Sequence, residues 1–315
     1  MNVLIPGGAS YVGAWLVPHL LGDGHVVTVY DSMLFGNGCL PDNDNCHVVK
    51  ADIRDSEAWA KACKGQEAVI YLASISRELM CQQNEGLAYE VNVESFRPNV
   101  EAARKAGVKR FIYGSSVAVY GSSDHDAKED EPLAPSTIYG RGKAACEVVL
   151  KDFEADMCCA VTRSASVCGY SPRQRLDLTI NRMVHDAVRR KEIKVEGGMQ
   201  KRSHVSIKDL ARFYRRLLDV KASRIAGQTF NVVDQNQAVK ESALMVSRVV
   251  GGTAIDVGPR VDDRSYSVDG TKAKLVLGFY PSNPLEQAVR DLMVRLDAGY
   301  WKDSMTNPVY QNVLA

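Results

Sequence analysis

The sequence lacks the features that mark membrane proteins, nucleic-acid-binding proteins and zinc-ribbon proteins. No apolar run approaches the about 18 residues of a membrane-spanning helix. The formal net charge is only +1, which gives no electrostatic reason to expect nucleic acid or an anionic membrane as a partner. There is no Cys-x-x-Cys pair, internal repeat or low-complexity segment. We therefore expect a soluble globular protein without a metal site.

The eight cysteines are spread along the chain, and two of them, Cys158 and Cys159, are adjacent. This pattern predicts free, mostly buried thiols in a reducing compartment. The chain enters an apolar strand at residues 2–5, with no basic leader before it. We therefore expect a cytoplasmic protein without a signal peptide.

What the sequence does contain begins with a glycine turn between a strand and a helix. Residues 2–5 predict a buried strand, residues 6–13 read Pro-Gly-Gly-Ala-Ser-Tyr-Val-Gly, and an apolar helical pattern continues to Leu21. In this context the first glycine permits a tight turn, and the last lets helix and strand pack closely. The helix N-terminus then offers N–H groups to a pyrophosphate. The predicted cofactor contacts in the turn are Gly7, Ser10, Tyr11, Val12 and Gly13.

Two acidic positions follow the next strands. Asp31 ends the strand at 25–30, about twenty positions after the turn, where a carboxylate binds an adenosine ribose hydroxyl and disfavours a 2′-phosphate. This predicts NAD rather than NADP, although a strand-end turn residue is the alternative. Asp52 and Ile53 follow the strand at 48–50 and are predicted to contact the adenine. The alternative there is a helix start, with Asp55 or Ser56 as its cap.

Strands continue to alternate with helices. Residues 68–72 and 109–113 predict a fourth and a fifth strand, and 158–163 a sixth. The small residues that follow the fourth strand leave room for a cofactor, and we expect contacts from Leu72, Ala73 and Ser74. A long helix is predicted over 85–106, kinked or divided at Pro98. This alternation predicts an α/β fold of the Rossmann type, with a doubly wound parallel sheet and ligands beyond the carboxyl ends of its strands.

Tyr139 and Lys143 lie four positions apart on a helix predicted over 138–154, so their side chains share one face. An ammonium beside a phenol favours the phenolate. Lowering a tyrosine pKa from about 10 to neutrality requires roughly 4 kcal/mol, which a lysine and a positively charged nicotinamide together could supply. The pair would then act as a base toward a sugar or alcohol hydroxyl. Solvated helices also carry such pairs by chance.

The second half differs in composition. Residues 170–202 hold an excess of Lys and Arg, which suits a ligand phosphate or a solvated helix face. Residues 229–233 predict a strand that returns to the sheet, and 241–250 and 285–296 predict amphipathic helices. We expect an NAD-binding domain from 1–165 plus about 227–240. A smaller α/β substrate-binding domain is expected from about 166–226 and 241–303, followed by a loose or partner-bound tail, 304–315.

Taken together, these motifs resemble the extended short-chain dehydrogenase/reductase family, in its nucleotide-sugar epimerase and dehydratase branch, over roughly residues 1–300. The family turn TGxxGxxG is matched at Gly7 and Gly13, but Pro6 and Ser10 depart from it. Ser10 adds a side chain where the backbone approaches the pyrophosphate. The family YxxxK is Tyr139 and Lys143. The resemblance implies NAD as cofactor, and three catalytic residues: Ser116, Tyr139 and Lys143.

The resemblance also implies a set of substrate contacts. Segment 171–178, SPRQRLDL, is similar to a segment of one subgroup, and the asparagine after it, Asn181, falls near the nucleotide diphosphate in relatives. Arg202 and Arg260 match phosphate or ribose ligands, and Tyr266 matches a gate residue that disfavours N-acetylated sugars. His204 is expected to be a packed strand residue. The complete set of implied substrate-site residues is Ser76, Asn92, Ser116, Val117, Asn181, Arg202, Arg260 and Tyr266. A homodimer built from helices 85–106 and 138–154 is expected.

Several reactions share the first step that this resemblance implies, in which Tyr139 takes a proton from a sugar hydroxyl while NAD is reduced. Dehydratases and decarboxylases carry an acidic group just after the Ser/Thr, where this chain has Val117 and Ala118. The leading expectation is therefore a nucleotide-sugar epimerase, most often acting at C4, on a nucleotide-diphosphate sugar. The main alternative is an oxidase or reductase that releases the keto sugar, with a nucleotide-linked heptose as a candidate substrate. A dehydratase or decarboxylase and an NAD-sensing regulator complete the set.

Overall fold

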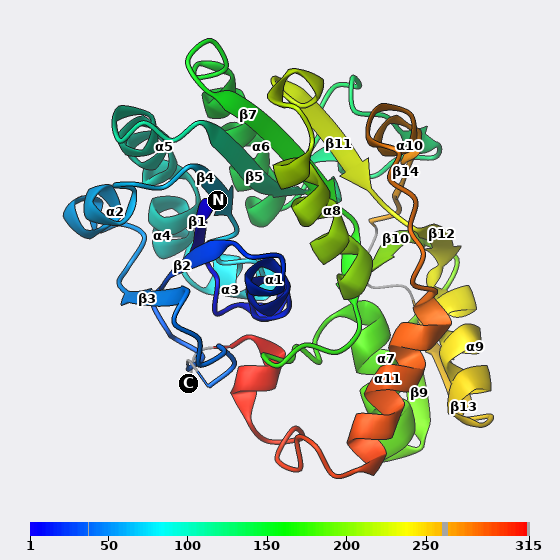
Figure 1. Cartoon of the computed structure of the whole chain (residues 1–315). Helices are drawn as coiled ribbons and strands as arrows, with labels where there is room; N and C mark the ends of the chain where they lie inside the picture. Colours follow the sequence, from blue (N-terminus) through cyan, green and yellow to red (C-terminus); the bar gives the residue numbers. More distant parts are fainter. Residues whose placement is uncertain (37, 260–263, 314–315) are drawn as a thin grey trace.

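The computed structural model describes residues 1–36, 38–259 and 264–313, and its core is one seven-stranded sheet (Figure 1). All neighbouring strands of this sheet are parallel, in the order β11-β7-β5-β4-β1-β2-β3. The order runs outward in both directions from β1, so the predicted doubly wound parallel sheet is confirmed. The strands are β1 (Asn2–Pro6), β2 (Val26–Asp31), β3 (Cys46–Lys50), β4 (Ala68–Tyr71), β5 (Arg110–Ser116), β7 (Cys158–Ser164) and β11 (Gln228–Val232).

The central strands are apolar over most of their length because both faces of the sheet are covered. Along β1, Val3 and Ile5 face one core while Leu4 faces another, as the two-residue period of a strand requires. Helices α1 (Tyr11–Gly22) and α8 (Ile207–Asp219) pack on the first face. Helices α2 (Ser56–Ala62), α5 (Phe96–Lys105) and α6 (Ile138–Lys151) cover the second. The switch in strand order between β1 and β4 leaves a crevice at their carboxyl ends.

A smaller layer with its own apolar core lies beside the carboxyl edge of the sheet (Figure 1). Its helices are α7 (Thr179–Arg190), α9 (Val239–Val250) and α11 (Leu285–Asp297), which pack on the parallel pair β9 (Glu192–Glu196) and β13 (Ala254–Gly258). A three-stranded sheet joins the two layers and contains β8 (Ser166–Cys168), β10 (Lys201–Ser206) and β12 (Gln235–Ala238). Short elements complete the chain: β6 (Asp126–Ala127), β14 (Ser267–Val268) and α10 (Thr271–Leu277).

The helix predicted over 85–106 is divided, but not at Pro98. The segment consists of α3 (Glu78–Gln83), α4 (Glu85–Tyr89), a π-helical turn (Glu90–Glu94) and α5. The break is the π-turn, in which the Ser95 N–H donates to the Glu90 carbonyl oxygen, five residues back. Pro98 is the third residue of α5, where the backbone nitrogen needs no partner within the helix, so the predicted kink at Pro98 is wrong.

The prediction of a loose or partner-bound tail is also wrong for residues 304–313. This segment ends in a 3-10 helix (Pro308–Gln311), and Figure 1 shows it passing below α1 and ending beside the loop after β2. Its backbone and side chains bond to the rest of the chain: the Leu176 N–H donates to the Tyr310 carbonyl oxygen at 2.8 Å, and His185 Nε2 lies 3.0 Å from Ser304 Oγ.

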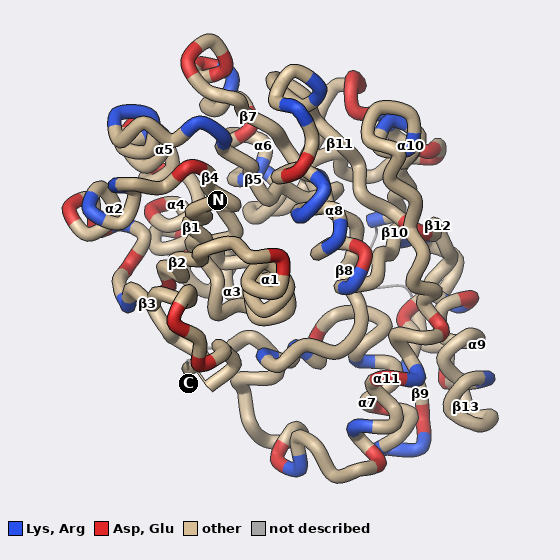
Figure 2. The backbone as a smooth tube through the Cα atoms, viewed as in Figure 1, with Lys and Arg blue, Asp and Glu red and all other residues tan. Residues whose placement is uncertain are grey.

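The charged residues have no one-sided distribution. Figure 2 shows both signs interspersed along the backbone, including α7 and β9 in the region predicted to be basic. Within the described residues, no helix is long and apolar enough to cross a bilayer, and no group of His, Cys, Asp and Glu has a metal-binding arrangement. All eight cysteines are free thiols, as predicted, and five of them are buried: Cys63, Cys81, Cys146, Cys159 and Cys168.

Candidate active site

The glycine turn presses the start of α1 against the end of β4. Gly7 has a φ of +81°, and a Cβ there would lie 2.7 Å from the Ala73 backbone nitrogen. A Cβ on Gly13 would lie 2.4 Å from the Gly8 carbonyl oxygen. Both contacts are far too short for a real side chain, so both positions require glycine. The N-terminus of α1 is thereby fixed at the carboxyl edge of the sheet, as the turn predicts.

Ser10 departs from the expectation that its side chain would add bulk beside the pyrophosphate. It is the N-cap of α1, and its Oγ accepts a hydrogen bond from the Gly13 N–H at 3.3 Å. A serine at this position satisfies one of the free N–H groups that begin a helix. The side chain is therefore turned back onto α1, while Ser10, Tyr11 and Val12 still line the neighbouring cavity.

Asp31 is held by the backbone of the turn. Its carboxylate accepts hydrogen bonds from Ala9 N–H at 3.1 Å and Met33 N–H at 2.9 Å. Burial raises the carboxyl pKa above its usual value, and these two N–H groups oppose that shift. The Met33 contact is that of a turn residue, and the Ala9 contact places Asp31 against the glycine turn, as a ribose ligand requires. The predicted ribose contact stays a prediction.

Asp52 and Ile53 both make local contacts within the chain. The Asp52 carboxylate forms a two-point ion pair with Arg54, whose guanidinium lowers the Asp52 pKa. Ile53 is part of the core between the sheet and α2. The side chain of Asp55 accepts from the Ala58 N–H and caps α2, as the alternative interpretation predicts. The adenine contacts predicted for Asp52 and Ile53 stay predictions.

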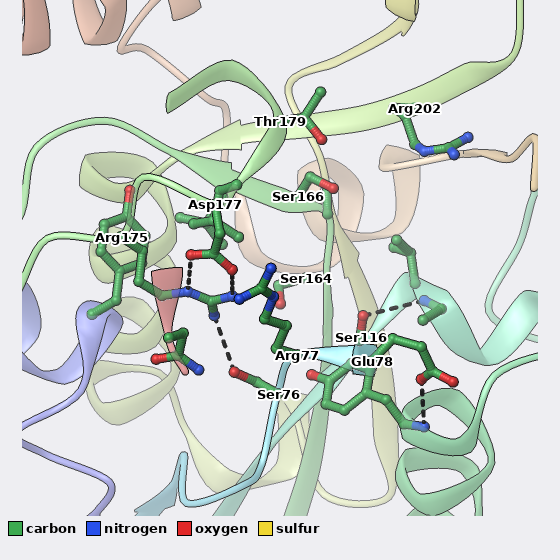
Figure 3. A pocket seen from close by; sticks show the side chains of 18 of the residues that line it. Ser76, Arg77, Glu78, Ser116, Ser164, Ser166, Arg175, Asp177, Thr179 and Arg202 are labelled. Atoms are coloured by element: carbon green, nitrogen blue, oxygen red, sulfur yellow. Dashed lines mark hydrogen bonds and ion pairs between the residues drawn. The ribbon is translucent and has the colours of Figure 1, made fainter. Parts of the chain in front are cut away.

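A cavity of about 630 Å³ occupies the crevice. It is lined by the start of α1, the loops after β4 and β5, helix α6 and the β8–α7 connection. Twelve of the predicted site residues line it: Ser10, Tyr11, Val12, Leu72, Ser74, Ser76, Ser116, Val117, Tyr139, Lys143, Arg202 and Tyr266. One wall is rich in hydroxyl groups, because Ser164, Ser166 and Thr179 add to Ser76 and Ser116 (Figure 3). Such a wall suits a polyhydroxylated ligand.

Ser116, Tyr139 and Lys143 come together at this cavity. The Lys143 ammonium donates to the Gly114 carbonyl oxygen at 2.7 Å and lies 5.6 Å from the centre of the Tyr139 ring. Ser116 ends β5, and its Oγ accepts from the Ala118 N–H at 3.2 Å. The helical spacing of Tyr139 and Lys143 in α6 therefore places both residues on the cavity side, as predicted.

The acidity of Tyr139 differs from the expectation. Burial raises the Tyr139 pKa to about 12, and the positive charge of Arg175 and a hydrogen bond with Ser116 only partly oppose this rise. Burial also lowers the Lys143 pKa to about 8. Desolvation thus outweighs the lysine in the chain alone. A phenolate near neutral pH requires the additional positive charge that the sequence argument assigned to the nicotinamide.

The carboxylate of Glu78 positions the start of α6, a contact that the sequence did not suggest. Its two oxygens accept from the N–H groups of Ile138 and Tyr139, each at 3.0 Å (Figure 3). A carboxylate at a helix N-terminus satisfies free N–H groups and interacts favourably with the helix dipole. Glu78 therefore fixes the backbone of the predicted catalytic tyrosine. No local signal reveals this, because sixty residues separate the partners.

A second unexpected feature is a buried ion pair at the centre of the cavity wall. Figure 3 shows Arg175 between Asp177 and Ser76. Arg175 Nε lies 3.0 Å from Asp177 Oδ1, and Arg175 NH1 lies 3.0 Å from Ser76 Oγ. The sequence placed Arg175 in a basic region without assigning it a role. The structure shows that its charge is balanced by Asp177 and reaches the Tyr139 phenol.

Asn92 and Asn181, both expected near the substrate, act on the backbone instead. Asn92 lies in the π-turn and bonds both backbone groups of Ile75, at 2.8 and 3.0 Å. Asn181 is fully buried; its Oδ1 accepts from the Gly169 N–H, and its Nδ2 donates to the Tyr11 hydroxyl. Neither side chain lines the cavity. Both hold loops that do, and a direct contact of either residue with the substrate stays a prediction.

The remaining substrate-side predictions fall at the far end of the cavity. Arg202 lies 5.1 Å from the centre of the Tyr266 ring, and its NH1 donates to the Lys201 carbonyl oxygen at 2.9 Å. His204 is buried, with its Nε2 3.3 Å from Ser242 Oγ, and burial lowers its pKa to about 4. Its predicted packing role is confirmed. Arg260 lies outside the described residues.

The low pKa of Lys143 predicts a pH-dependent stability difference. A lysine with a folded pKa of about 8 and an unfolded pKa of 10.5 destabilises the folded chain below pH 8. At about 1.4 kcal/mol per pKa unit, this penalty is on the order of 3 kcal/mol, and it disappears as pH rises through both values. The stability of wild type relative to Lys143→Met should therefore increase between pH 8 and 10.5. Urea unfolding of the cofactor-free proteins measures it.

Lys61→Met, on the exposed surface of α2, is the matched control for this measurement. Its stability difference from wild type should stay flat over the same pH range. A flat difference for Lys143→Met as well would show that the buried ammonium is not destabilised.

The parallel sheet, the glycine turn and the Ser116, Tyr139 and Lys143 cluster define a dinucleotide-binding protein of the Rossmann type. Comparison with known proteins makes this specific: the chain belongs to the NAD dependent epimerase/dehydratase family, whose model matches residues 3–232. A UDP-glucose 4-epimerase of Mycolicibacterium smegmatis is 29% identical over 308 residues, covering 92% of this chain and 96% of the relative. A dTDP-glucose 4,6-dehydratase of Streptomyces griseus is 26% identical, covering 89% of each chain.

Solved structures share the fold at lower identity. The UDP-glucuronic acid 4-epimerase of Bacillus cereus, in complex with UDP-glucuronic acid and NAD, aligns with a TM-score of 0.87 at 21% identity, covering 95% of this chain and all of that one. DesIV, a dTDP-glucose 4,6-dehydratase of Streptomyces venezuelae with NAD bound, aligns with a TM-score of 0.84 at 24% identity, covering 96% of this chain and 99% of that one. At these identities the likeness concerns the fold.

The crevice fits NAD, the cofactor of this family. The close approach of Gly7 to Ala73 and the N-terminus of α1 provide a phosphate-binding cradle. Ser74 Oγ, buried at the cavity, has no hydrogen-bond partner among the described residues. A buried hydroxyl without a partner is unfavourable, and a polar group of a ligand would relieve it. The residues that would hold NAD are those of the glycine turn together with Ser74, Tyr139 and Lys143.

Proposed function

We propose that the chain is a nucleotide-sugar epimerase, acting at C4 through a transient 4-keto sugar. The observation that carries this proposal is the cluster of Ser116, Tyr139 and Lys143 at a hydroxyl-rich cavity, followed in sequence by the apolar Val117 and Ala118. Relatives named as 4-epimerases, including the Mycolicibacterium smegmatis protein, support the same reaction. Membership of the family alone is compatible with a dehydratase as well.

When bound, NAD would supply the hydride acceptor and donor that this reaction requires, and the residues of the chain would handle the proton and the developing charge. Tyr139 removes the proton from the C4 hydroxyl as the carbonyl forms, and gives it back when the alcohol is restored. Ser116 donates a hydrogen bond to the same oxygen, which stabilises the charge that develops on it. Lys143, fixed by the Gly114 carbonyl, supplies the positive charge beside the phenol and would bond a ribose hydroxyl of the cofactor.

The cavity walls beside Ser116 favour rotation of the keto sugar within the site over an elimination reaction. A 4,6-dehydratase or decarboxylase needs a group that moves a proton at C5 or C6, and neither Val117 nor Ala118 can do so. Glu78 lines the same cavity, but both its oxygens accept backbone N–H groups of α6. An epimerase requires only that the flat keto sugar turn and take hydride on its other face. Apolar walls permit this rotation because they fix neither face.

We assign the nucleotide diphosphate to the smaller layer. Arg202, at the end of the cavity away from α1, is the proposed phosphate or ribose ligand, and Tyr266 the proposed gate. The division into an NAD-binding and a nucleotide-sugar-binding domain remains a proposal, as does the homodimer. The exposed apolar side chains of Tyr89 on α4 and Val148 on α6 are compatible with that dimer.

A product assay tests the proposed reaction. Protein loaded with NAD, but without free cofactor, is incubated with UDP-, GDP-, CDP- and dTDP-hexoses, and products are identified by NMR. We expect at least one sugar to reach an equilibrium mixture of its C4 epimers without net absorbance at 340 nm from NADH. One equivalent of NADH with a released keto sugar would instead identify an oxidase, and a 4-keto-6-deoxy product a dehydratase.

A further inference from the structure

Arg173 is a buried cation whose Nε donor has no hydrogen-bond partner among the described residues. It lies in the β8–α7 connection, is only 6% exposed and lines the cavity. Its NH2 donates to Asn312 Oδ1 at 2.8 Å, its NH1 donates weakly to the Gln174 carbonyl oxygen at 3.4 Å, and its guanidinium lies 4.1 Å from the centre of the Phe35 ring. Its Nε has no partner within the described part of the chain.

Among the residues that the structure describes, no carboxylate is bonded to this guanidinium. The nearest acidic groups are already engaged: Asp177 with Arg175, and Asp31 with the N–H groups of Ala9 and Met33. Burial and the like charge of Arg175 lower the Arg173 pKa to about 10, so it remains charged at neutral pH. A buried charge without a bonded counterion is unfavourable, and an anion in the cavity would stabilise it.

The loop that carries Arg173 is fastened to the N-terminus of α1. The Ser171 hydroxyl donates to the Tyr11 carbonyl oxygen at 2.7 Å, and the Tyr11 hydroxyl donates to the Gly169 carbonyl oxygen at 2.7 Å. The N-terminus of a twelve-residue helix such as α1 attracts anions. Arg173 and the free N–H groups of α1 therefore face the same part of the crevice, and Arg173 adds a full positive charge there.

Residues 308–313, here called the strap, fix Arg173 from the other side. Arg77 donates to the Gln311 carbonyl oxygen, and the Leu176 N–H donates to the Tyr310 carbonyl oxygen at 2.8 Å. Asn312 is nearly buried and lines the cavity. The strap thus connects the loop after β4 with the β8–α7 connection, and it lies beside the loop after β2 (Figure 1). Through Asn312, the strap also forms part of the cavity lining.

We propose that Arg173 donates its open Nε–H to the pyrophosphate of bound NAD, and that the strap, by holding Arg173 through Asn312, slows release of the cofactor. Neither residue belongs to the motifs of the glycine turn or the Tyr/Lys pair. The proposal concerns cofactor retention alone and does not depend on which sugar reaction follows. An enzyme that returns its hydride to the same substrate gains from such retention, because the cofactor need not leave between turnovers.

Calorimetric titration of cofactor-stripped protein tests the role of Arg173. Arg173→Met keeps the apolar stem and removes every donor. We expect its Kd for NAD to rise about 10- to 100-fold, the range for loss of a charge-assisted hydrogen bond. Arg173→Lys keeps the positive charge, and its Kd for NAD should lie between those of wild type and Arg173→Met. Arg97→Met, which removes an exposed arginine from α5, is the matched control and should leave the Kd unchanged.

The ligand series locates the contact. If Arg173 binds the pyrophosphate, Arg173→Met should weaken ADP-ribose and NAD by the same factor and adenosine much less. An equal loss for adenosine would overturn the pyrophosphate contact, and an unchanged Kd for NAD would overturn the role of Arg173 altogether. Thermal unfolding of the cofactor-stripped variants verifies that each is folded. If Arg173→Met does not fold, the Kd of Arg173→Lys for NAD decides the test.

A separate variant tests the strap. Asn312 has a φ of +52°, a conformation that glycine adopts freely, so Asn312→Gly removes the side chain without backbone strain. We expect the NAD dissociation rate, measured by displacement in a stopped-flow instrument, to increase about tenfold. Hydrogen exchange over 308–313 should slow on NAD binding in wild type, and this protection should be lost in Arg173→Met. An unchanged NAD dissociation rate in Asn312→Gly would contradict the proposal that the strap slows release of the cofactor.

Discussion

Tyr139→Phe is expected to lower kcat by about 10²- to 10⁴-fold while NAD affinity stays within about threefold. The change removes only the hydroxyl, and α6, capped by the Glu78 carboxylate, keeps its position. Lys143 and its bond to Gly114 also remain. Loss of turnover with retained cofactor binding would identify the phenol as the proton-transfer group. Steady-state rates on the best sugar substrate and calorimetric NAD titration give the two quantities.

The control for this variant is Tyr280→Phe, which removes a hydroxyl from an exposed tyrosine between α10 and α11. It should leave both measurements unchanged. A Tyr139→Phe variant with normal kcat would place the base elsewhere and contradict the proposed mechanism. The pH profile adds a second condition: since the Tyr139 pKa is about 12 in the chain alone, wild-type activity near neutral pH requires that bound cofactor lower it substantially.

The parts of the site that were predictable from sequence are those whose geometry is local. The spacing of Tyr139 and Lys143 on one helix fixes their common face, and the turn from Gly7 to Gly13 fixes the strand–helix crossing. The strands of the seven-stranded sheet were equally predictable, because strands covered on both faces are mostly apolar. In each case the residues that determine the local structure lie within a few positions of one another. The sequence pattern can therefore be recognised without knowledge of the tertiary structure.

What was missed depends on contacts between distant segments. Glu78 reaches the start of α6 across sixty residues, and Asn312 reaches Arg173 across 139. The π-turn that carries Asn92 divides the segment before Pro98, the position at which a kink or division was predicted. The Tyr139 pKa was misjudged for a related reason. The lysine was visible in the sequence, whereas the burial that outweighs it was not.

The second large effect is expected from Glu147→Ala. Glu147 lies one turn after Lys143 on α6 and forms an ion pair with Arg163 of β7, 2.7 Å between Arg163 NH2 and Glu147 Oε2, with both side chains buried. It also accepts from the Ser115 hydroxyl of β5. Removing the carboxylate leaves Arg163 buried without a counterion. We expect a loss of roughly 3–5 kcal/mol in the free energy of unfolding, measured by urea denaturation.

The reason for so large a loss is the unpaired charge, and two further variants separate it from lost packing. Asp152→Ala breaks the exposed pair with Arg97 and should change stability little, because surface pairs contribute little. Glu147→Leu combined with Arg163→Met removes both charges and should recover much of the loss, since a buried pair replaced by apolar residues of similar volume is often neutral. If the double variant is as unstable as Glu147→Ala, the unpaired charge is not the cause of the loss. The loss would then come from other contacts of these side chains, such as the hydrogen bond from Arg163 NH1 to the Tyr120 hydroxyl.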